Sequence, residues 1–211
     1  MSIKGFAKDL VVLVADRNME FALKGILARH QALRTREVTY DIYVHPERDP
    51  GCLNRGHDFL RPFTRIYERA LVLLDCYGCG RAGVPADELE KQIQTRLAQS
   101  GWDYRTAAIV LDPELEIWVW SDSPHVAKAL GWENRRPPLR NWLRNEGLIQ
   151  PGEVKPDQPK KAMEKALWVA RKQRSSSIYE EVALHVSLQD CGDRKFCQLK
   201  MLLQNWYPRN P

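Results

Sequence analysis

The stretch LVVLVAD, residues 10–16, decides the fold class of this chain. Its apolar residues are mostly Val and Leu, and they run into an acidic residue and then into a helical pattern. Short apolar runs that alternate with helices predict buried strands of a parallel sheet with helices on both faces. We therefore expect an α/β fold with a four-stranded, mainly parallel sheet and a C-terminal helical extension. The expected strands are Leu10–Ala15, Glu37–Val44, Ala70–Leu74 and Ala107–Leu111.

Acidic residues follow three of these runs. They are Asp16 and Glu20 after the first run, Asp75 after the third, and Asp112, Glu114 and Glu116 after the fourth. Ligand sites in open parallel sheets lie at the carboxyl ends of the strands. Carboxylates that converge there repel one another unless a cation lies among them, and oxygen ligands suit Mg²⁺ or Mn²⁺. The pattern predicts a divalent-metal site. A purely structural alternative for Glu114 and Glu116 is stabilisation of a helix N-terminus.

Composition places the chain among ordinary soluble proteins, with 211 residues, 44% hydrophobic and 28% charged. No apolar stretch has the length of a membrane span, and the N-terminus lacks a signal-peptide core, so we expect a cytoplasmic protein without membrane contact. An odd number of cysteines, five, argues against a disulfide framework. Cys76 and Cys79 form a CxxC pair, which we interpret as small packed thiols rather than as a zinc or redox site.

Basic residues gather in the last third of the chain. Residues 131–174 hold 11 Lys or Arg against 5 Asp or Glu, in a chain of net charge +5. This distribution indicates a nucleic-acid backbone as partner, although a solvated helix face is the alternative. Three tryptophans lie in the segment, and their helical spacing favours core anchors over base stacking. The candidate nucleic-acid-binding residues are Arg140, Arg144, Lys160 and Lys161, and the tryptophans are Trp132, Trp142 and Trp168.

We expect an α/β domain over residues 1–130 and a basic helical extension over 131–211. In the first part, Asn18 is the predicted N-cap of a helix over 18–30. The segment 45–56, HPERDPGCLNRG, is predicted to be a long loop that precedes a helix over 57–68. Further helices are predicted over 86–99, 139–146, 159–172, 176–185 and 194–206.

The order of these motifs resembles that of Toprim domains, the metal-binding fold of topoisomerases, primases and OLD-type nucleases. The closer resemblance is to Toprim-like proteins related to the RloB group, many of them linked to bacterial phage defence. LVVLVADRNMEFALKGIL (10–27) resembles their opening strand and helix, which commonly reads VEGxxE. ALVLLDCYGCG (70–80) resembles their aspartate motif, and DPELEIWVW (112–120) resembles their acidic-aromatic motif. PKKAMEKAL (159–167) and FCQLKMLLQNW (196–206) are similar to their C-terminal signatures.

The resemblance covers most of the chain and is nearest to a Toprim-like subunit of a methylation-associated bacterial defence system. It implies phosphodiester hydrolysis, with Asp16, Asp75 and Glu116 as ligands of Mg²⁺ or Mn²⁺. Glu20 or Glu114 would act as general base or orient the water. Two departures from the family pattern matter. The first acid is Asp instead of Glu, and the DxD of most Toprim domains reads Asp-Cys-Tyr at residues 75–77.

Three hypotheses follow. The first is a metal-dependent nuclease of bacterial anti-phage defence, acting on DNA or RNA. The second is a binding subunit with a degenerate Toprim fold, which docks nucleic acid or another protein of a defence complex; the missing second acid favours it. The third is an enzyme that acts on a phosphorylated small molecule, and the absence of a nucleotide-loop motif weakens it. His45 and His57 are further candidates for proton transfer, outside the predicted set of site residues.

Overall fold

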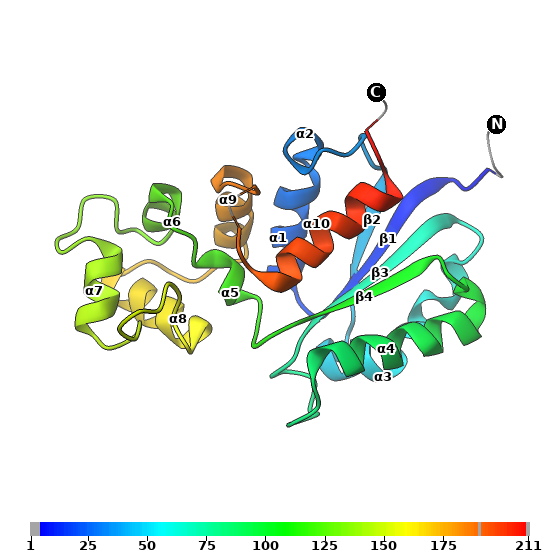
Figure 1. The fold of residues 1–211 in the computed structure, drawn as a ribbon, viewed down its shortest axis with the longest axis horizontal. Coiled ribbons are helices and arrows are strands. Elements are labelled where there is room, and N and C mark those ends of the chain that lie inside the picture. The colour runs from blue at the N-terminus through cyan, green and yellow to red at the C-terminus, as the bar shows by residue number, and fades with distance from the viewer. Residues whose placement is uncertain (1–4, 190, 210–211) are drawn as a thin grey trace.

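The computed structural model of this chain describes residues 5–189 and 191–209. Its centre is a sheet of four parallel strands in the order β2-β1-β3-β4. Figure 1 shows these strands side by side, with helices on both faces of the sheet. The predicted α/β class is confirmed, and the described sheet is wholly parallel. The strands are β1 (Lys8–Val14), β2 (Tyr40–Val44), β3 (Tyr67–Asp75) and β4 (Thr106–Leu111).

Burial explains why the central strands read as uninterrupted apolar runs. Residues 10–14 of β1 and 70–74 of β3 have no exposed surface, because each strand has a neighbour on both sides and helices on both faces. Val and Leu at every position suit such a strand. β2 lies at the edge of the sheet, where all five of its residues are only partly buried, and its sequence YDIYV contains a charge. The apolar pattern therefore follows the position of each strand in the sheet.

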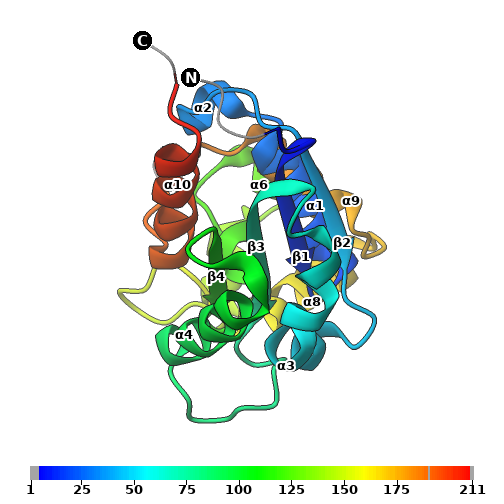
Figure 2. The ribbon, with the colours of Figure 1, turned by 90° about the vertical axis from the view of Figure 1, so that its right-hand side faces the viewer.

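Helices form a layer on each face of the sheet. α3 (Arg48–Leu60) and α4 (Ala86–Leu97) cover one face, and α1 (Arg17–Leu27) and α10 (Arg194–Trp206) cover the other (Figures 1 and 2). In α4 the buried residues include Leu89, Ile93 and Leu97, whose spacing of four places them on one helix face. The short α2 (His30–Leu33) follows α1, a 3₁₀ turn spans Arg61–Phe63, and a π-helical turn spans Ala98–Trp102.

The C-terminal part adds further helices after β4. Of these, α9 (Ser177–His185) packs against α1. Gly25 of α1 allows this close approach, since a Cβ there would lie 2.7 Å from Cβ of Ala183. α6, α7 and α8 form the end of the molecule that projects from the sheet in Figure 1. The boundary at residue 130 stays a prediction. The helices are α5 (Glu116–Val119), α6 (Pro124–Ala129), α7 (Leu139–Asn145), α8 (Pro159–Ala170) and α9 (Ser177–His185).

The predicted loop at 45–56 and helix at 57–68 are wrong. α3 begins at Arg48 and ends at Leu60, and β3 already begins at Tyr67. The other predicted helices are confirmed to within about a turn at either end.

Proline and glycine explain the error in α3, because they usually mark loops. Pro50 lies in the first turn of α3, where its missing N–H removes no helical hydrogen bond. Gly51 and Gly56 face close neighbours, since a Cβ at Gly51 would collide with the ring of His45 and one at Gly56 would lie 3.4 Å from Cδ2 of Leu13. Gly51 therefore serves the close packing of the helix against His45, whereas a Cβ at Gly56 would make an ordinary contact.

The tryptophans of the basic segment divide into two kinds. Trp132 and Trp142 are buried with ring centroids 4.6 Å apart, as expected of core anchors. Trp168 on α8 is 79% exposed, so its interpretation as a core anchor is wrong. Position 168 lies on the face of α8 that also carries Lys161, and this face points to solvent.

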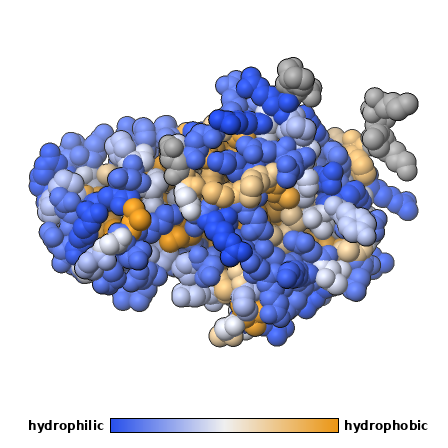
Figure 3. Space-filling model, viewed as in Figure 1, coloured by the Kyte–Doolittle hydropathy of each residue, from blue (hydrophilic) through white to orange (hydrophobic). Residues whose placement is uncertain are grey.

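The face of the molecule in Figure 3 is largely hydrophilic, with small apolar areas between charged side chains. None of the helices in the described part of the chain is both long enough and apolar enough to span a membrane.

Candidate functional site

Asp16 occupies the carboxyl end of β1 and is the N-cap of α1. Its Oδ1 accepts a hydrogen bond from the Met19 N–H at 2.9 Å. A short carboxylate suits this position because the first N–H groups of a helix have no partner within the helix. The prediction of Asn18 as N-cap is therefore wrong. Nδ2 of Asn18 instead donates to Oδ2 of Asp16 at 3.4 Å and helps to orient it.

Asp75 is the last residue of β3 and is held from two sides. Its Oδ1 accepts the Leu115 N–H at 2.8 Å, and its own N–H donates to Oδ1 of Asp49 at 2.7 Å. Asp49 lies in the first turn of α3, beyond the carboxyl end of β2. Gly78 permits this arrangement, since a Cβ there would collide with the Asp49 carboxylate. Asp49 is absent from the predicted site residues because the proline and glycines of its segment predict a loop; the signal that could have found it is its place just beyond the second strand.

These carboxylates influence one another's ionisation. Burial raises the pKa of Asp75 well above its usual range, and the charges of Asp49, Glu116 and Asp16 add to this effect. Burial also raises the pKa of Asp49, again with a contribution from Asp16. Like charges in proximity disfavour the ionised form. We refer to Asp16, Asp49, Asp75 and Glu116 as the acidic cluster; it contains all three predicted metal ligands.

Glu116 is the first residue of α5, and its side chain is 4% exposed. Its Oε1 accepts hydrogen bonds from Nη2 of Arg174 at 2.8 Å and from the Tyr179 hydroxyl at 2.5 Å. These contacts compensate a buried charge that would otherwise be costly. Nη1 of Arg174 also donates to Glu164 at 2.5 Å. Sequence reasoning missed the partners of Glu116 because they come from distant parts of the chain without a local motif.

The two predicted general bases lie in different surroundings. Glu20 forms a half-buried ion pair of 2.6 Å with Lys24 along α1. Glu114 accepts the N–H of Lys160 at 2.9 Å, at the start of α8. Burial raises the pKa of Glu114, and the charge of Glu116 contributes in the same direction. Glu114 therefore adjoins the acidic cluster, whereas Glu20 is paired along its own helix.

The predicted nucleic-acid-binding residues also differ in availability. Arg140 is engaged within the protein: its Nε lies 2.8 Å from Oδ1 of Asp122, and its Nη1 donates to the carbonyl of Val154 at 3.0 Å. Arg144, Lys160 and Lys161 are exposed. Lys160 lies nearest the site, through its backbone contact with Glu114.

His45 follows β2 and is buried beside α3. Its Nδ1 accepts the Glu47 N–H at 3.0 Å, which assigns the proton of the neutral ring to Nε2. Burial lowers the pKa of His45, so the ring is neutral at pH 7. His57 belongs to the last turn of α3, about 12 Å along the helix from Asp49. The structure therefore brings only His45 near the carboxyl edge of the sheet.

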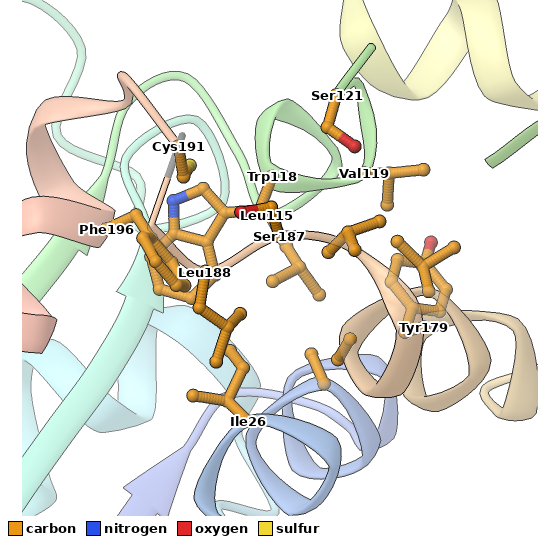
Figure 4. A pocket seen from close by; sticks show the side chains of 14 residues that line it. Ile26, Leu115, Trp118, Val119, Ser121, Tyr179, Ser187, Leu188, Cys191 and Phe196 are labelled. Carbon is orange, nitrogen blue, oxygen red and sulfur yellow. The ribbon is translucent and has the colours of Figure 1, made fainter. Parts of the chain in front are cut away.

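An apolar cavity of about 40 Å³ lies behind the acidic cluster, between α1, α5, α9 and the start of α10 (Figure 4). Trp118, Val119 and Phe196 are among its lining residues. Two others also contact the cluster: Leu115 through its N–H to Asp75 and Tyr179 through its hydroxyl to Glu116. The cavity has room for only about two or three water molecules. We interpret it as imperfect packing behind one wall of the site.

Within residues 5–189 and 191–209, no group of three or more His, Cys, Asp or Glu side chains is arranged to hold a metal ion. Glu116 instead contacts Arg174 and Tyr179, while Asp49 and Asp75 each use Oδ1 to accept a backbone N–H. The chemistry of the acidic cluster still fits Mg²⁺ or Mn²⁺, because a divalent cation would relieve the repulsion among its carboxylates.

Comparison with known proteins adds no family to this description. No family model matches the chain, and neither the curated proteins nor the solved structures contain a match.

Proposed function

We propose that this protein is a divalent-metal-dependent nuclease that hydrolyses phosphodiester bonds at the carboxyl edge of its sheet. The observation that supports this most is that Asp16, Asp75 and Glu116 lie at or beyond the carboxyl ends of three neighbouring parallel strands, where the charges of Asp49, Glu116 and Asp16 add to the effect of burial in raising the pKa of Asp75. Clustered carboxylates with raised pKa values destabilise the folded protein at neutral pH and are typical of functional sites. The position at the carboxyl ends of parallel strands is the usual one for a ligand.

In this proposal Asp16, Asp75 and Glu116 hold Mg²⁺ or Mn²⁺, and Asp49 supplies a fourth carboxylate. A bound divalent ion lowers the pKa of a water molecule and neutralises charge on the phosphate. The protein's own contribution is to hold the carboxylates in place through the backbone N–H groups that bind Asp16 and Asp75. Arg174, which contacts Glu116, is positioned to bind a phosphate oxygen as well.

Glu114 is the better candidate for the general base. Its pKa is raised by burial, which brings it closer to the working pH, and it adjoins Glu116. Glu20 would first have to leave Lys24. His45 is neutral with its proton on Nε2, so this N–H would donate a hydrogen bond to a phosphate oxygen of a substrate bound against the same edge of the sheet.

We further propose a family and a cellular role for this protein. We assign the fold to the Toprim-like group and the activity to bacterial phage defence in the cytoplasm, on the motif resemblance described above. The parallel sheet with acids after its strands is compatible with that fold. The exposed basic residues Arg144, Lys160 and Lys161 would contact phosphates of DNA or RNA.

A catalytically degenerate binding subunit is the alternative, and two observations favour it. The second acid of the aspartate motif is replaced by Tyr77, whose side chain is 74% exposed and offers no carboxylate. Glu116 is already bound by Arg174 and Tyr179. In this case the same surface would dock nucleic acid or another protein of a defence complex.

A cleavage assay separates the two functions. Labelled single-stranded and duplex DNA and RNA are incubated with the protein in Mg²⁺, Mn²⁺ or EDTA. We expect cleavage that depends on the divalent ion and is abolished by Asp75→Asn. The control is Asp103→Asn, which removes an exposed carboxylate before β4, at the opposite edge of the sheet. Binding of nucleic acid without any cleavage would establish the alternative and contradict the nuclease.

A further inference from the structure

A second feature of the carboxyl edge is a cleft of about 500 Å³ beside the acidic cluster. It lies at the ends of β1 and β2, with the start of α8 and the segment before α9 as its other wall. Four cationic side chains line it: Arg17, Arg48, Lys160 and Arg174. Asp16 is its single carboxylate lining residue. The cations thus come from four separate segments of the chain, which only the fold brings together.

Two of the four cationic side chains, Arg17 and Arg48, are without an ion-pair partner in the described part of the chain. The side chains of these two arginines also form no hydrogen bond with any other described residue. Arg174 is bound to Glu116 and Glu164, as described above. His45 also lines the cleft but adds no charge, because burial lowers its pKa.

The charge of Lys160 also acts on Asp49 and Glu114, where it opposes the rise in pKa that burial causes. Arg17 and Arg48 therefore supply the unpaired positive charge of the cleft, and an anion bound between them would be stabilised by both.

The charge and the volume together indicate the class of anion. A terminal phosphomonoester carries roughly −1.5 to −2 at pH 7, whereas each internal phosphodiester carries a single negative charge. Sites of about 300 to 1,000 Å³ are typical for small ligands, so the cleft is large enough for the last nucleotide of a strand. Binding along the internal phosphodiesters of a nucleic-acid strand would require a continuous row of basic residues. Here the cationic side chains are gathered in one cleft instead.

We infer that this cleft binds the terminal phosphate of a nucleic-acid strand and places that end of the strand beside the acidic cluster. The inference deepens the proposed nuclease and rests on it, since it makes a phosphorylated strand end the preferred substrate. A 5′-phosphate and a 3′-phosphate share the chemistry that the cleft recognises, and the experiment distinguishes them.

The test compares three fluorescent single-stranded oligonucleotides of one sequence, with a 5′-phosphate, a 3′-phosphate or hydroxyls at both ends. Fluorescence anisotropy is measured in EDTA, so that binding is separated from cleavage. Hydrogen bonds to charged groups predict about ten- to hundred-fold tighter binding of one phosphorylated end. Inorganic phosphate should compete with that end and reduce the preference.

Substitutions of the cleft arginines test whether the preference for a phosphorylated end arises in the cleft. Arg17→Gln and Arg48→Gln should each reduce the preference for the phosphorylated end several-fold. Arg65→Gln is the matched control, because Arg65 is exposed just before β3, at the opposite edge of the sheet. The two cleft arginines and the control arginine are all exposed, and circular dichroism checks that each variant is folded.

Each result has a defined meaning. Equal affinity for all three oligonucleotides, or no binding at all, overturns the inference. An undiminished preference in both cleft variants also overturns it. A separate cleavage assay in Mn²⁺ tests the proposed function. Cleavage without any preference for a phosphorylated end would support the nuclease but overturn the inference that the cleft binds a terminal phosphate. Preferential binding of a phosphorylated end without cleavage would support the cleft as a binding site but contradict the nuclease.

Discussion

Replacing Lys195 with Met should strongly destabilise the protein, because Lys195 connects α10 to α4 inside the fold. Its side chain is 7% exposed, and its Nζ lies 2.6 Å from Oδ1 of Asp87 and 2.6 Å from Oε1 of Glu90. Glu90 is equally buried. After the substitution its carboxylate keeps only the Val110 N–H at 2.8 Å and Nε2 of Gln198 at 3.1 Å as partners.

Removing one partner of a buried ion pair costs about 3–5 kcal/mol, since the other charge stays buried without compensation. A loss of that size is a large part of the roughly 5–15 kcal/mol that stabilises a typical domain. Urea unfolding followed by circular dichroism measures the change in the free energy of unfolding. Adding Glu90→Gln to Lys195→Met should restore part of the loss, because it removes the uncompensated charge and keeps an acceptor for the Val110 N–H.

Arg194→Met is the matched control for Lys195→Met. Arg194 also binds Asp87, but its side chain is 77% exposed, so we expect a loss of less than about 1 kcal/mol. The reasoning would be refuted if Lys195→Met cost no more than Arg194→Met. It would also be refuted if Glu90→Gln deepened the loss in the double variant.

Three further predictions concern the site and its surroundings. In EDTA, Asp75→Asn should raise the free energy of unfolding at pH 7, because the raised pKa of Asp75 means that its ionisation destabilises the folded protein. The gain should vanish as the pH falls below about 4, where the carboxyl is protonated in the folded and unfolded states alike; a pH-independent gain would argue against repulsion. Gly25→Ala should cost about 1–3 kcal/mol in urea unfolding, since its Cβ would lie 2.7 Å from Cβ of Ala183 and α1 would have to move from α9; an unchanged midpoint would contradict this packing. Trp168→Ala should change stability by less than about 0.5 kcal/mol but weaken single-stranded oligonucleotide binding by about 1–3 kcal/mol, and unchanged affinity would exclude base stacking there.

The sequence predicted the sheet because burial leaves a clear mark on it. Strands such as β1 and β3, with neighbours on both sides, require apolar residues throughout, and their runs located them to within a few residues. Asp16, Asp75 and Glu116 are predicted as site residues in the same way, from their places after apolar runs, and their role stays a prediction. What local patterns cannot show is packing between distant segments.

Two errors illustrate this limit. α3 was read as a loop because Gly51 and Gly56 look like turn residues until the ring of His45 and the side chain of Leu13 are seen against them. That error hid Asp49. Likewise, helical spacing could not tell that Trp168 faces solvent while Trp132 and Trp142 face each other.

Anomalous X-ray diffraction from crystals grown with Mn²⁺ would detect a divalent metal ion bound by the acidic cluster. We expect an anomalous peak among the carboxylates of Asp16, Asp75 and Glu116, and the loss of this peak in Asp75→Asn crystals grown under the same conditions. Crystals of the parent protein in Mn²⁺ with no peak at these carboxylates, or with a peak that persists in the variant, would contradict the account.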